Sequence, residues 1–369
     1  MCCVRVSGDV RSLATALSVA ARAVPARTTV PVLNGCRLSA VGGALELAAT
    51  DLDVAVAYRP AGLSVEGGGA AVVPARYLLD LARHLEGEFT LECGEKEAEL
   101  RCGRGVYRLN GYDPSSYPEV KGPEDGLAAE VEFEFLRKVS GRVGVACARD
   151  LSRPALTGVL WEVSPEGLTL VATDGTRLAV WRVPEVLPDV RRVVVPGRGL
   201  DLVAAMPAPP EGEKVAVRLG SSHVWFEAPS WSVSSRLLAS PYPEWRQVLP
   251  RVFVASFQVS LPVFVGALRR AAVVSAAGSG LPAVQLSVRP GVVEVDASSA
   301  SVGRAHEELE AEVEGSPLEV AFNTNLLFDG LDAFEGERVL FRLAGSQSVS
   351  ELSDPADGSY RYLVLPLRL

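Results

Sequence analysis

The side chains most able to catalyse a reaction or bind a metal are scattered along this sequence. Its three histidines, His84, His223 and His306, have no partner at the spacing of a catalytic triad or a metal site. The run from His306 to Glu310 begins like a zinc-protease helix but lacks the second histidine. No phosphate-binding G-x-x-x-x-G-K-[ST], dinucleotide fingerprint or G-x-S-x-G is present. We therefore predict no catalytic residue, no metal site and no cofactor.

Two aspartates recur in matching contexts, and both are candidates for chemistry. Asp51 and Asp174 each follow a threonine at the end of an apolar stretch. An aspartate directly after a strand commonly accepts hydrogen bonds from the N–H groups of a turn, so we interpret both as structural. A hydrolase that uses a repeated aspartate such as Asp174 remains an alternative. Loss of activity in Asp174→Asn, with assembly intact, would favour it.

Composition restricts the cellular setting and the class of protein. The 369 residues carry a net charge of −9 and are 48% hydrophobic, which fits a folded protein. No apolar run reaches the roughly 18 residues of a membrane span, and the first residues lack the apolar core of an export signal. The six cysteines include no C-x-x-C pair, which favours a reducing compartment. We expect a cytoplasmic protein with no membrane partner.

An internal repeat organises the chain. Leu45–Asp51 recurs as Leu168–Asp174, 123 positions later, and Tyr117–Glu119 recurs as Tyr242–Glu244, 125 positions later. A third, degenerate copy opens with the helical pattern of Val263–Val274. A two-domain protein with a coincidental tail is the alternative. We predict three domains, at residues 1–124, 127–249 and 251–369, with a charged Pro/Gly linker at residues 121–126.

Each copy is predicted to contain two helices among strands, which makes the chain α+β. Asp9–Val24 has an apolar stripe of helical period, and its polar side chains share the opposite face. A second helix is predicted at Arg76–Leu85. The predicted strands of the first copy have alternating or β-branched residues, at Gly43–Thr50, Val54–Tyr58, Phe89–Cys93, Ala98–Cys102 and Val106–Asn110.

Charge is distributed unevenly between helices and the rest of the chain. The six predicted helices carry a net charge of +4, which leaves −13 for everything else. A basic helical surface with an acidic remainder suits sequence-independent contact with a polyanion such as DNA. A repeat scaffold with no nucleic-acid role is the alternative, and it predicts no retention on circular DNA.

Several runs together resemble bacterial DNA sliding clamps, the beta subunits of DNA polymerase III. These runs are V-V-P-A-R ending at Arg76, A-T-D-G-T-R-L-A ending at Ala179, Y-P-E-W-R-Q-V-L-P ending at Pro250, and the terminal Y-L-V-L-P-L-R-L. The resemblance spans the whole chain in order. It implies a non-catalytic DNA polymerase processivity factor in DNA replication, built from three clamp domains.

The resemblance also implies an assembly and a DNA-binding surface. Two chains would close head-to-tail into a homodimeric ring, with helices lining a central hole and antiparallel sheets outside, around sequence-independent double-stranded DNA. The implied interface joins the strand around Tyr107 and Leu109 to the region 297–307, with Val273 and Val274 nearby. The DNA-facing candidates are arginines on or after inner helices: Arg27, Arg76, Arg83, Arg149, Arg198 and Arg270.

Finally, the resemblance implies a peptide-binding cleft between the second and third domains. Its expected partners are the replicative polymerase alpha subunit, the clamp loader and other proteins with a clamp-binding motif. Thr176 and Gln247 depart from residues common in the family, which leaves the preferred motif open. The implied cleft residues are Arg153, Leu156, Thr173, Gly175, Thr176, Arg177, Leu178, Pro243, Val248, Leu363, Val364, Leu365, Pro366, Leu367 and Arg368.

Overall fold

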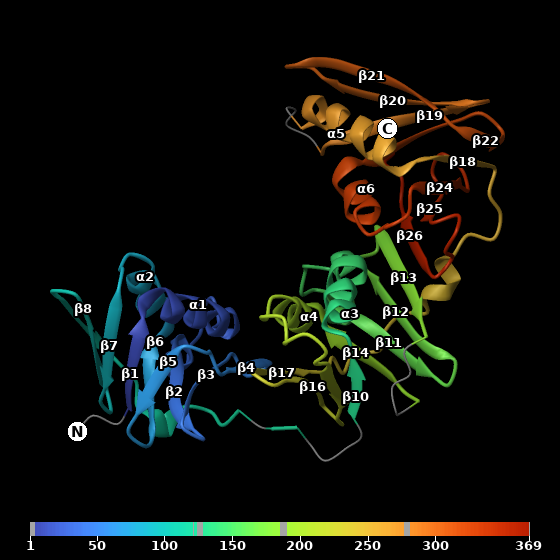
Figure 1. Ribbon diagram of the computed structural model, residues 1–369. Coiled ribbons are helices and arrows are strands. Elements are labelled where there is room, and N and C mark those ends of the chain that lie inside the picture. Colours follow the sequence, from blue (N-terminus) through green and yellow to red (C-terminus); the bar gives the residue numbers. More distant parts are fainter. Residues whose placement is uncertain (1–3, 121, 124–127, 185–189, 277–280, 369) are drawn as a thin grey trace. The chain divides into compact units, whose positions relative to one another are not determined.

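The computed structural model describes residues 4–120, 122–123, 128–184, 190–276 and 281–368 (Figure 1). The predicted linker at residues 121–126 therefore lies mostly outside the described residues, and so do the expected boundaries at 124 and 127. Among the helices described, none combines the length and the apolar composition that a bilayer crossing requires.

The chain forms two compact units, and each is described here by itself. One consists of Met1–Arg137 and Arg198–Leu237, and the other of Lys138–Gly197 and Leu238–Leu369. The division falls inside the middle third of the sequence, so each unit holds one terminal repeat and part of the central one.

The first repeat has the predicted helices and strands, with boundaries within two residues except for the end of its first helix. That helix, α1, is Val10–Ala20 and continues as a short 3₁₀ turn over Ala21–Ala23. Leu13 and Leu17 are fully buried, as the apolar stripe predicts. The elements β1, β2, β5 and β6 are additional to the predicted strands. The elements are β1 (Val4–Asp9), α1, β2 (Gly35–Val41), β3 (Ala44–Thr50), β4 (Val54–Tyr58), β5 (Leu63–Glu66), β6 (Ala70–Pro74), α2 (Ala75–Arg83), β7 (Glu88–Cys93), β8 (Glu97–Cys102) and β9 (Gly105–Asn110).

The central repeat follows the same order, except that one strand is described between β13 and α4 where the first repeat has two between β4 and α2. Its first helix is short and irregular, because α3 ends at Lys138 and continues as one π turn over Val139–Val143. Glycines 141 and 144 in this stretch weaken a regular α-helix. The elements are β10 (Ala128–Val131), α3 (Phe133–Lys138), β11 (Gly158–Ser164), β12 (Gly167–Thr173), β13 (Arg177–Val183), β14 (Arg192–Pro196), α4 (Gly197–Ala204), β15 (Val215–Leu219), β16 (His223–Ala228) and β17 (Trp231–Arg236).

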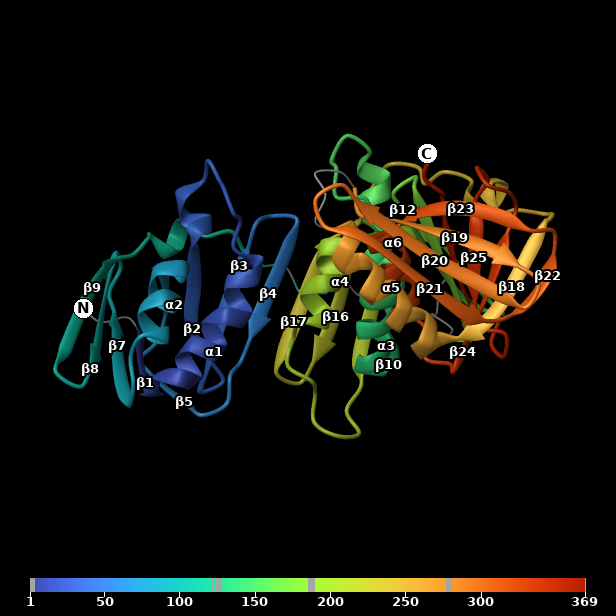
Figure 2. The same cartoon turned by 90° about the horizontal axis from the view of Figure 1, so that it is seen from above.

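The third repeat, which is degenerate in sequence, keeps this architecture. Its two helices lie close to one another and α5 packs on β20 and β21, an arrangement that Figure 2 shows. The elements are β18 (Ala255–Ser260), α5 (Leu261–Ser275), β19 (Ala283–Arg289), β20 (Val292–Ser299), β21 (Gly303–Glu310), β22 (Glu312–Gly315), β23 (Leu318–Asn323), α6 (Thr324–Leu331), β24 (Arg338–Leu343), β25 (Ser350–Ser353) and β26 (Tyr360–Val364).

Four antiparallel sheets result, and two of them join neighbouring repeats. The eight-stranded sheet has the order β10-β15-β16-β17-β4-β3-β2-β6, so β17 of the central repeat pairs with β4 of the first. The nine-stranded sheet has the order β14-β11-β12-β13-β26-β25-β24-β18-β22, so β26 of the third repeat pairs with β13 of the second. The remaining sheets, β5-β1-β7-β8-β9 and β21-β20-β19-β23, end at β9 and β21.

The repeat is reproduced at the level of single hydrogen bonds. The Thr50 hydroxyl donates to the Val54 carbonyl at 2.7 Å, and the Thr173 hydroxyl donates to the Arg177 carbonyl at 2.6 Å. In both turns the aspartate side chain accepts two backbone N–H bonds: Asp51 accepts from residues 53 and 54, and Asp174 accepts from 176 and 177. The structural interpretation of the two aspartates is therefore confirmed.

Candidate functional site

The predicted peptide-binding residues, here called the peptide surface, come from elements far apart in sequence. The register of β13 against β26 places Leu178 opposite Leu363 and Arg177 opposite Val364. Because both strands belong to one sheet, side chains separated by 185 positions become neighbours. All the elements of this surface lie within the unit of residues 138–197 and 238–369.

An apolar cluster forms the base of the peptide surface. Leu156, Leu178 and Leu363 are buried in one cluster with Tyr242 and Trp245. Truncating such a leucine to alanine typically costs about 2–5 kcal/mol of stability. Tyr242 and Trp245 were not among the predicted site residues, although both lie in the Y-P-E-W run that carries the family resemblance.

Above this base, apolar side chains are open to solvent. Val248 is 54% exposed and Leu365 is 42% exposed, and both border the buried cluster in sequence. Large aliphatic groups are costly to leave in water, so a pair of them above a buried apolar base marks a surface able to bind another apolar group.

The C-terminal segment is fixed by backbone hydrogen bonds on both sides. Leu365 N–H donates to the Thr176 carbonyl at 2.8 Å, and Leu367 N–H donates to the Ala321 carbonyl at 2.7 Å. Pro366, Leu367 and the exposed Arg368 therefore run from the Thr-Asp turn of the central repeat toward β23. The end of the chain is part of this surface.

Two arginines of the peptide surface, Arg177 and Arg153, differ in availability. Arg177 is buried and paired with Asp174, at 3.0 Å, and with Asp329 of α6. It stabilises the turn and its contact with α6. Arg153 is exposed, and its guanidinium lies over Gly175, where a Cβ would approach Arg153 Nη1 to 2.8 Å. Glycine at this position, with φ of +91°, provides the room for that side chain.

Several of the predicted DNA-facing arginines are engaged within the chain. Arg198 pairs with Asp51, Arg83 with Asp80 at 3.6 Å, and Arg270 with both carboxylate oxygens of Glu307 through its Nε and Nη2. Arg76 donates to the Val24 and Pro25 carbonyls, at 3.3 and 3.1 Å, and so ties α2 to the end of α1. Among the described residues, Arg27 and Arg149 make no ion pair.

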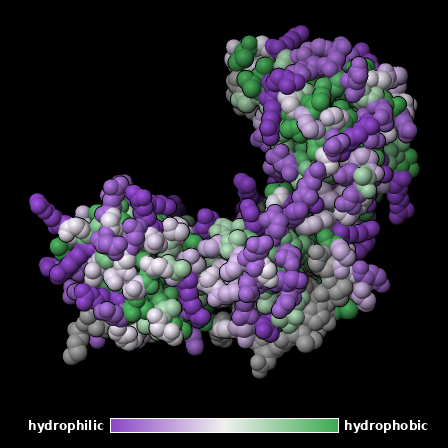
Figure 3. All heavy atoms as spheres, in the orientation of Figure 1, coloured by the Kyte–Doolittle hydropathy of each residue, from purple (hydrophilic) through white to green (hydrophobic). Residues whose placement is uncertain are grey.

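The predicted interface residues lie at sheet edges. Tyr107 and Leu109 are half-buried on β9, which is the last strand of its sheet, and Val273 and Val274 lie near the end of α5, which packs against the edge strand β21. Val273 is 72% exposed, and Figure 3 shows apolar side chains gathered at the end of α5 and the tip of the β20–β21 hairpin. Such an apolar group beside an unpaired strand edge suits pairing with another chain.

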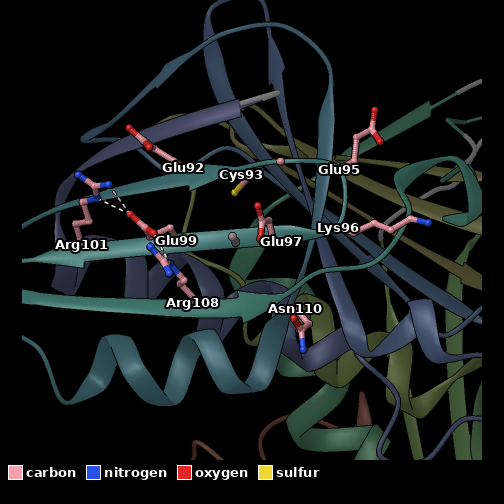
Figure 4. Close-up of a pocket in the computed structure, with 11 residues that line it drawn as sticks. Glu92, Cys93, Glu95, Lys96, Glu97, Glu99, Arg101, Arg108 and Asn110 are labelled. Carbon is pink, nitrogen blue, oxygen red and sulfur yellow. Dashed lines mark hydrogen bonds and ion pairs between the residues drawn. The ribbon is translucent and has the colours of Figure 1, made fainter. Parts of the chain in front are cut away.

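A hollow that the sequence did not suggest lies over β7, β8 and β9, with a volume of about 830 Å³. Figure 4 shows Arg101 and Arg108 converging on Glu99, which accepts hydrogen bonds from them at 2.6 and 2.7 Å. These bonds, that from Arg108 foremost, hold the pKa of Glu99 below its usual range. The other charged residues that line this hollow include Glu92 and Glu97.

Two of the histidines contact a backbone carbonyl or neighbouring carboxylates. His84 contacts the Asp80 carbonyl at 2.7 Å, and His306 lies 2.8 Å from Asp296 and 3.5 Å from Glu308. In the part of the chain that the structure describes, no group of three or more His, Cys, Asp and Glu side chains is placed to hold a metal ion.

Comparisons with known proteins agree with this architecture. Three family profiles match in order: the DNA polymerase III beta subunit N-terminal domain at residues 7–121, the central domain at 130–244 and the C-terminal domain at 246–368. A beta sliding clamp from Synechococcus elongatus is 32% identical over 370 residues, covering 97% of each chain. One from Staphylococcus aureus is 27% identical over 365 residues, covering 96% of each.

Solved structures give the same result. A DNA polymerase sliding clamp from Bacillus subtilis superposes with a TM-score of 0.89 at 25% identity, covering 99% of both chains. A sliding clamp from Pseudomonas aeruginosa bound to griselimycin gives 0.86 at 28% identity, covering 99% of this chain and 100% of that one. The predicted α+β class with three tandem clamp domains is therefore confirmed. The chain belongs to the beta sliding clamp family, the non-catalytic processivity subunits of DNA polymerase III.

Proposed function

We propose that two copies of this chain close head-to-tail into a ring by pairing β9 of one with β21 of the other. The observation that carries this proposal is the strand order. At the first junction β4 pairs with β17, and at the second β13 pairs with β26. In each case the fourth strand of one repeat pairs with the last strand of the next repeat. By the same rule, the outer edge of β21 has no partner strand among the described residues of this chain, and β9 of another copy supplies one.

The internal junctions also predict a register for the pairing between copies. Val54 lies opposite Ser235, and Arg177 lies opposite Val364. Hairpin alignment makes Gly303 of β21 equivalent to Val54, and Leu109 of β9 equivalent to Ser235. Gly303 is therefore expected opposite Leu109 of the second copy, Arg304 opposite Arg108, and Ala305 opposite Tyr107.

This register places Arg304 of one copy beside Arg108 of the other. Like charges directly opposite each other on a sheet are destabilising. Glu99 offsets the repulsion, because it already accepts a hydrogen bond from Arg108 at 2.7 Å on the same face. The apolar group near Val273 and Val302 would then be covered by the second copy.

We propose that the closed ring encircles double-stranded DNA without reading its sequence. Because Arg83, Arg198 and Arg270 are already paired with carboxylates, the attraction to phosphate is mild, and a mild attraction keeps the barrier to sliding low. Arg27 and Arg149 are the strongest candidates for direct phosphate contact. Replication of bacterial DNA places this work in the cytoplasm.

Loading the protein on nicked circular DNA and on the same DNA linearised tests encirclement. A ring is retained on the circle and slides from the free ends of the linear molecule. Arg149→Glu should lower loading efficiency and still leave retention dependent on circularity. Equal loss from circle and line would contradict encirclement.

We also propose that the peptide surface binds short motifs of the replicative polymerase alpha subunit, the clamp loader and other clamp-binding proteins. A buried base of Leu178 and Leu363 below exposed Val248 and Leu365 supports this role, because leucine and aromatic anchors bind best in desolvated apolar sites.

A labelled peptide from the C-terminus of a replicative polymerase tests the peptide surface. Val248→Glu and deletion of the segment from Pro366 onward should each weaken binding at least about tenfold, which is 1.4 kcal/mol. Val252→Glu is the control, because Val252 is also exposed but lies outside the surface. Unchanged affinity in both test variants, with sedimentation unaltered, would refute the assignment.

A further inference from the structure

A second pocket lies at the other internal junction, where β17 pairs with β4, and nothing in the proposed function uses it. This β4–β17 pocket has a volume of about 250 Å³. It lies wholly within the unit of residues 1–137 and 198–237. Its lining comprises Thr50, Leu52, Asp53, Val54, Ala55, Pro118, Glu119, Val120, Gly122, Ser222, His223, Trp225 and Ser234.

Several residues that line this pocket are the repeat equivalents of residues in the peptide surface. The segment 50–55 is equivalent to 173–178, because both form the same Thr-Asp turn. Pro118 matches Pro243 in the repeated Tyr-Pro-Glu run. Ser234 matches Leu363, since each faces the equivalent residue of the adjoining strand: Ala55 in one case and Leu178 in the other.

Smaller side chains open the pocket at these positions. Val54 replaces the buried Arg177, Ala55 replaces Leu178 and Ser234 replaces Leu363. At the second junction the larger side chains fill this space with chain atoms. At the first junction, the indole of Trp225 lies opposite Ser234 on the adjacent strand and lines the space with an aromatic surface.

The charge of the lining indicates which occupant fits. Asp53 and Glu119 contribute carboxylates, of which Asp53 lies 4.0 Å from Arg236 Nη1, and no described lining residue is a lysine or an arginine. Leu52 adds an aliphatic side chain that is 58% exposed. A volume of about 250 Å³ is below the roughly 300–1,000 Å³ of most small-molecule sites, and it suits one large side chain of an extended peptide.

We propose that the β4–β17 pocket binds a short segment of a partner protein that carries one leucine or aromatic anchor beside lysine or arginine. The anchor packs on Trp225 between Ala55 and Ser234, and the basic residue faces Asp53 and Glu119. The comparison between junctions rests on the proposed role of the peptide surface. The existence of the pocket, its apolar lining and its charge are independent of that proposed role.

A pair of labelled hexapeptides provides the probe. Each has Leu-Phe at its centre, flanked by lysines in one peptide and by glutamates in the other. Fluorescence anisotropy with the full chain should show saturable binding of the lysine peptide, at least about tenfold tighter than the glutamate peptide. Equal binding of both peptides would overturn the proposed charge preference.

Variants that fill the pocket identify the binding site. Ser234→Leu and Ala55→Leu install the side chains found at the equivalent positions of the peptide surface, so each suits the local fold. Each should weaken binding of the lysine peptide at least about tenfold, and so should Glu119→Lys. Ser232→Leu is the matched control, because Ser232 lies on the same face of β17 but outside the pocket lining. The affinity of this variant for the lysine peptide should stay within about twofold of the wild-type value.

Three results would overturn the proposal. Undiminished binding in both filled variants places the peptide elsewhere. Loss in Val248→Glu, without loss in Ser234→Leu, assigns the peptide to the peptide surface. A changed sedimentation coefficient in Ser234→Leu shows that another copy of the chain covers this pocket. Because the readout is peptide affinity at the first junction, failure here leaves retention on circular DNA intact.

Discussion

At the scale of single residues, the two Thr-Asp turns show how one backbone conformation is met by different side chains. Gly175 has φ of +91°, and its counterpart Leu52 has φ of +81°. Leu52 is the one residue other than glycine with positive φ in the part of the chain that the structure describes. Left-handed backbone costs an L-residue about 1–2 kcal/mol, so the first turn carries strain that the second avoids.

Exchanging residues at these positions should move stability in opposite directions. Gly175→Ala should destabilise by about 1–2 kcal/mol, because the new Cβ meets both the backbone strain and Arg153 Nη1. Leu52→Gly should stabilise by about 0.5–1 kcal/mol after the entropy cost of glycine. Urea denaturation midpoints measure both changes. Destabilisation of similar size in both variants would show that positive φ is not the source of strain.

His306 is predicted to make a pH-dependent contribution to the β20–β21 hairpin. The hydrogen bond to Asp296, with help from Glu308, raises the pKa of the imidazole above its usual value. A raised pKa means that the stabilisation is fully present below about pH 6.5 and is lost as pH rises through the folded-state value.

Thermal unfolding of the wild type and His306→Gln at several pH values measures this contribution. The difference in melting temperature should be largest below about pH 6.5 and should shrink as the pH rises above that value. Asp296→Asn should lower the imidazole pKa measured by NMR. A difference in melting temperature that grows with pH would contradict the assigned sign.

At the scale of elements, a repeated tyrosine fastens the end of one repeat to its own sheet. The Tyr117 hydroxyl is shared between the Ala48 carbonyl of β3, at 3.3 Å, and the Gly35 carbonyl, at 3.4 Å, and Tyr242 donates to the Val171 carbonyl of β12 at 3.4 Å. Burial raises the pKa of both hydroxyls, so both remain protonated donors. The chain segment that follows each tyrosine and leads to the next repeat therefore begins from an equivalent position on its sheet.

Removing either hydroxyl should cost a similar amount. Tyr117→Phe and Tyr242→Phe are each expected to lower the free energy of unfolding by about 0.5–1.5 kcal/mol, the usual contribution of one hydrogen bond. Tyr77→Phe is the control, because Tyr77 is an exposed residue of α2. A cost at position 242 alone would mean that the two bonds are not equivalent.

At the scale of the whole molecule, assembly depends on whether Glu99 neutralises the proposed meeting of Arg108 and Arg304. Glu99→Gln removes the charge but keeps the size, so the dissociation constant of the dimer should rise about five- to tenfold. Glu95→Gln is the control, since Glu95 lines the same hollow without an ion pair among the described residues. Sedimentation velocity measures the dimer. An unchanged constant in Glu99→Gln would reject the proposed register.

Acid should act on the same contact. Hydrogen bonding to Arg108, then to Arg101, lowers the pKa of Glu99. Stabilisation from a lowered carboxyl pKa is present above the unfolded value and is lost as pH falls through the folded one. Protonated Glu99 would also no longer offset the proposed repulsion between Arg108 and Arg304, so the wild-type dimer is expected to weaken below about pH 4, the range in which a glutamate titrates. Glu99→Gln should show a smaller change over that range.

The sequence by itself determined the local features. Period-2 and helical patterns located β7 and α1, because a strand or helix repeats its burial every few residues. The roles of Asp51 and Asp174 followed from turn chemistry that involves only the next three residues. The internal repeat predicted the three-domain organisation, which the matches to all three beta-subunit domains confirm.

Only the tertiary structure decided how distant segments meet. Leu178 and Leu363 become neighbours through strand pairing, and Arg177 reaches Asp329 across 152 positions. Arg198 and Arg270, exposed cations by sequence pattern, are paired with Asp51 and Glu307. Local periodicity states which face of an element is buried, but it carries no information about which other element covers that face. That choice is made by the packing of the complete chain.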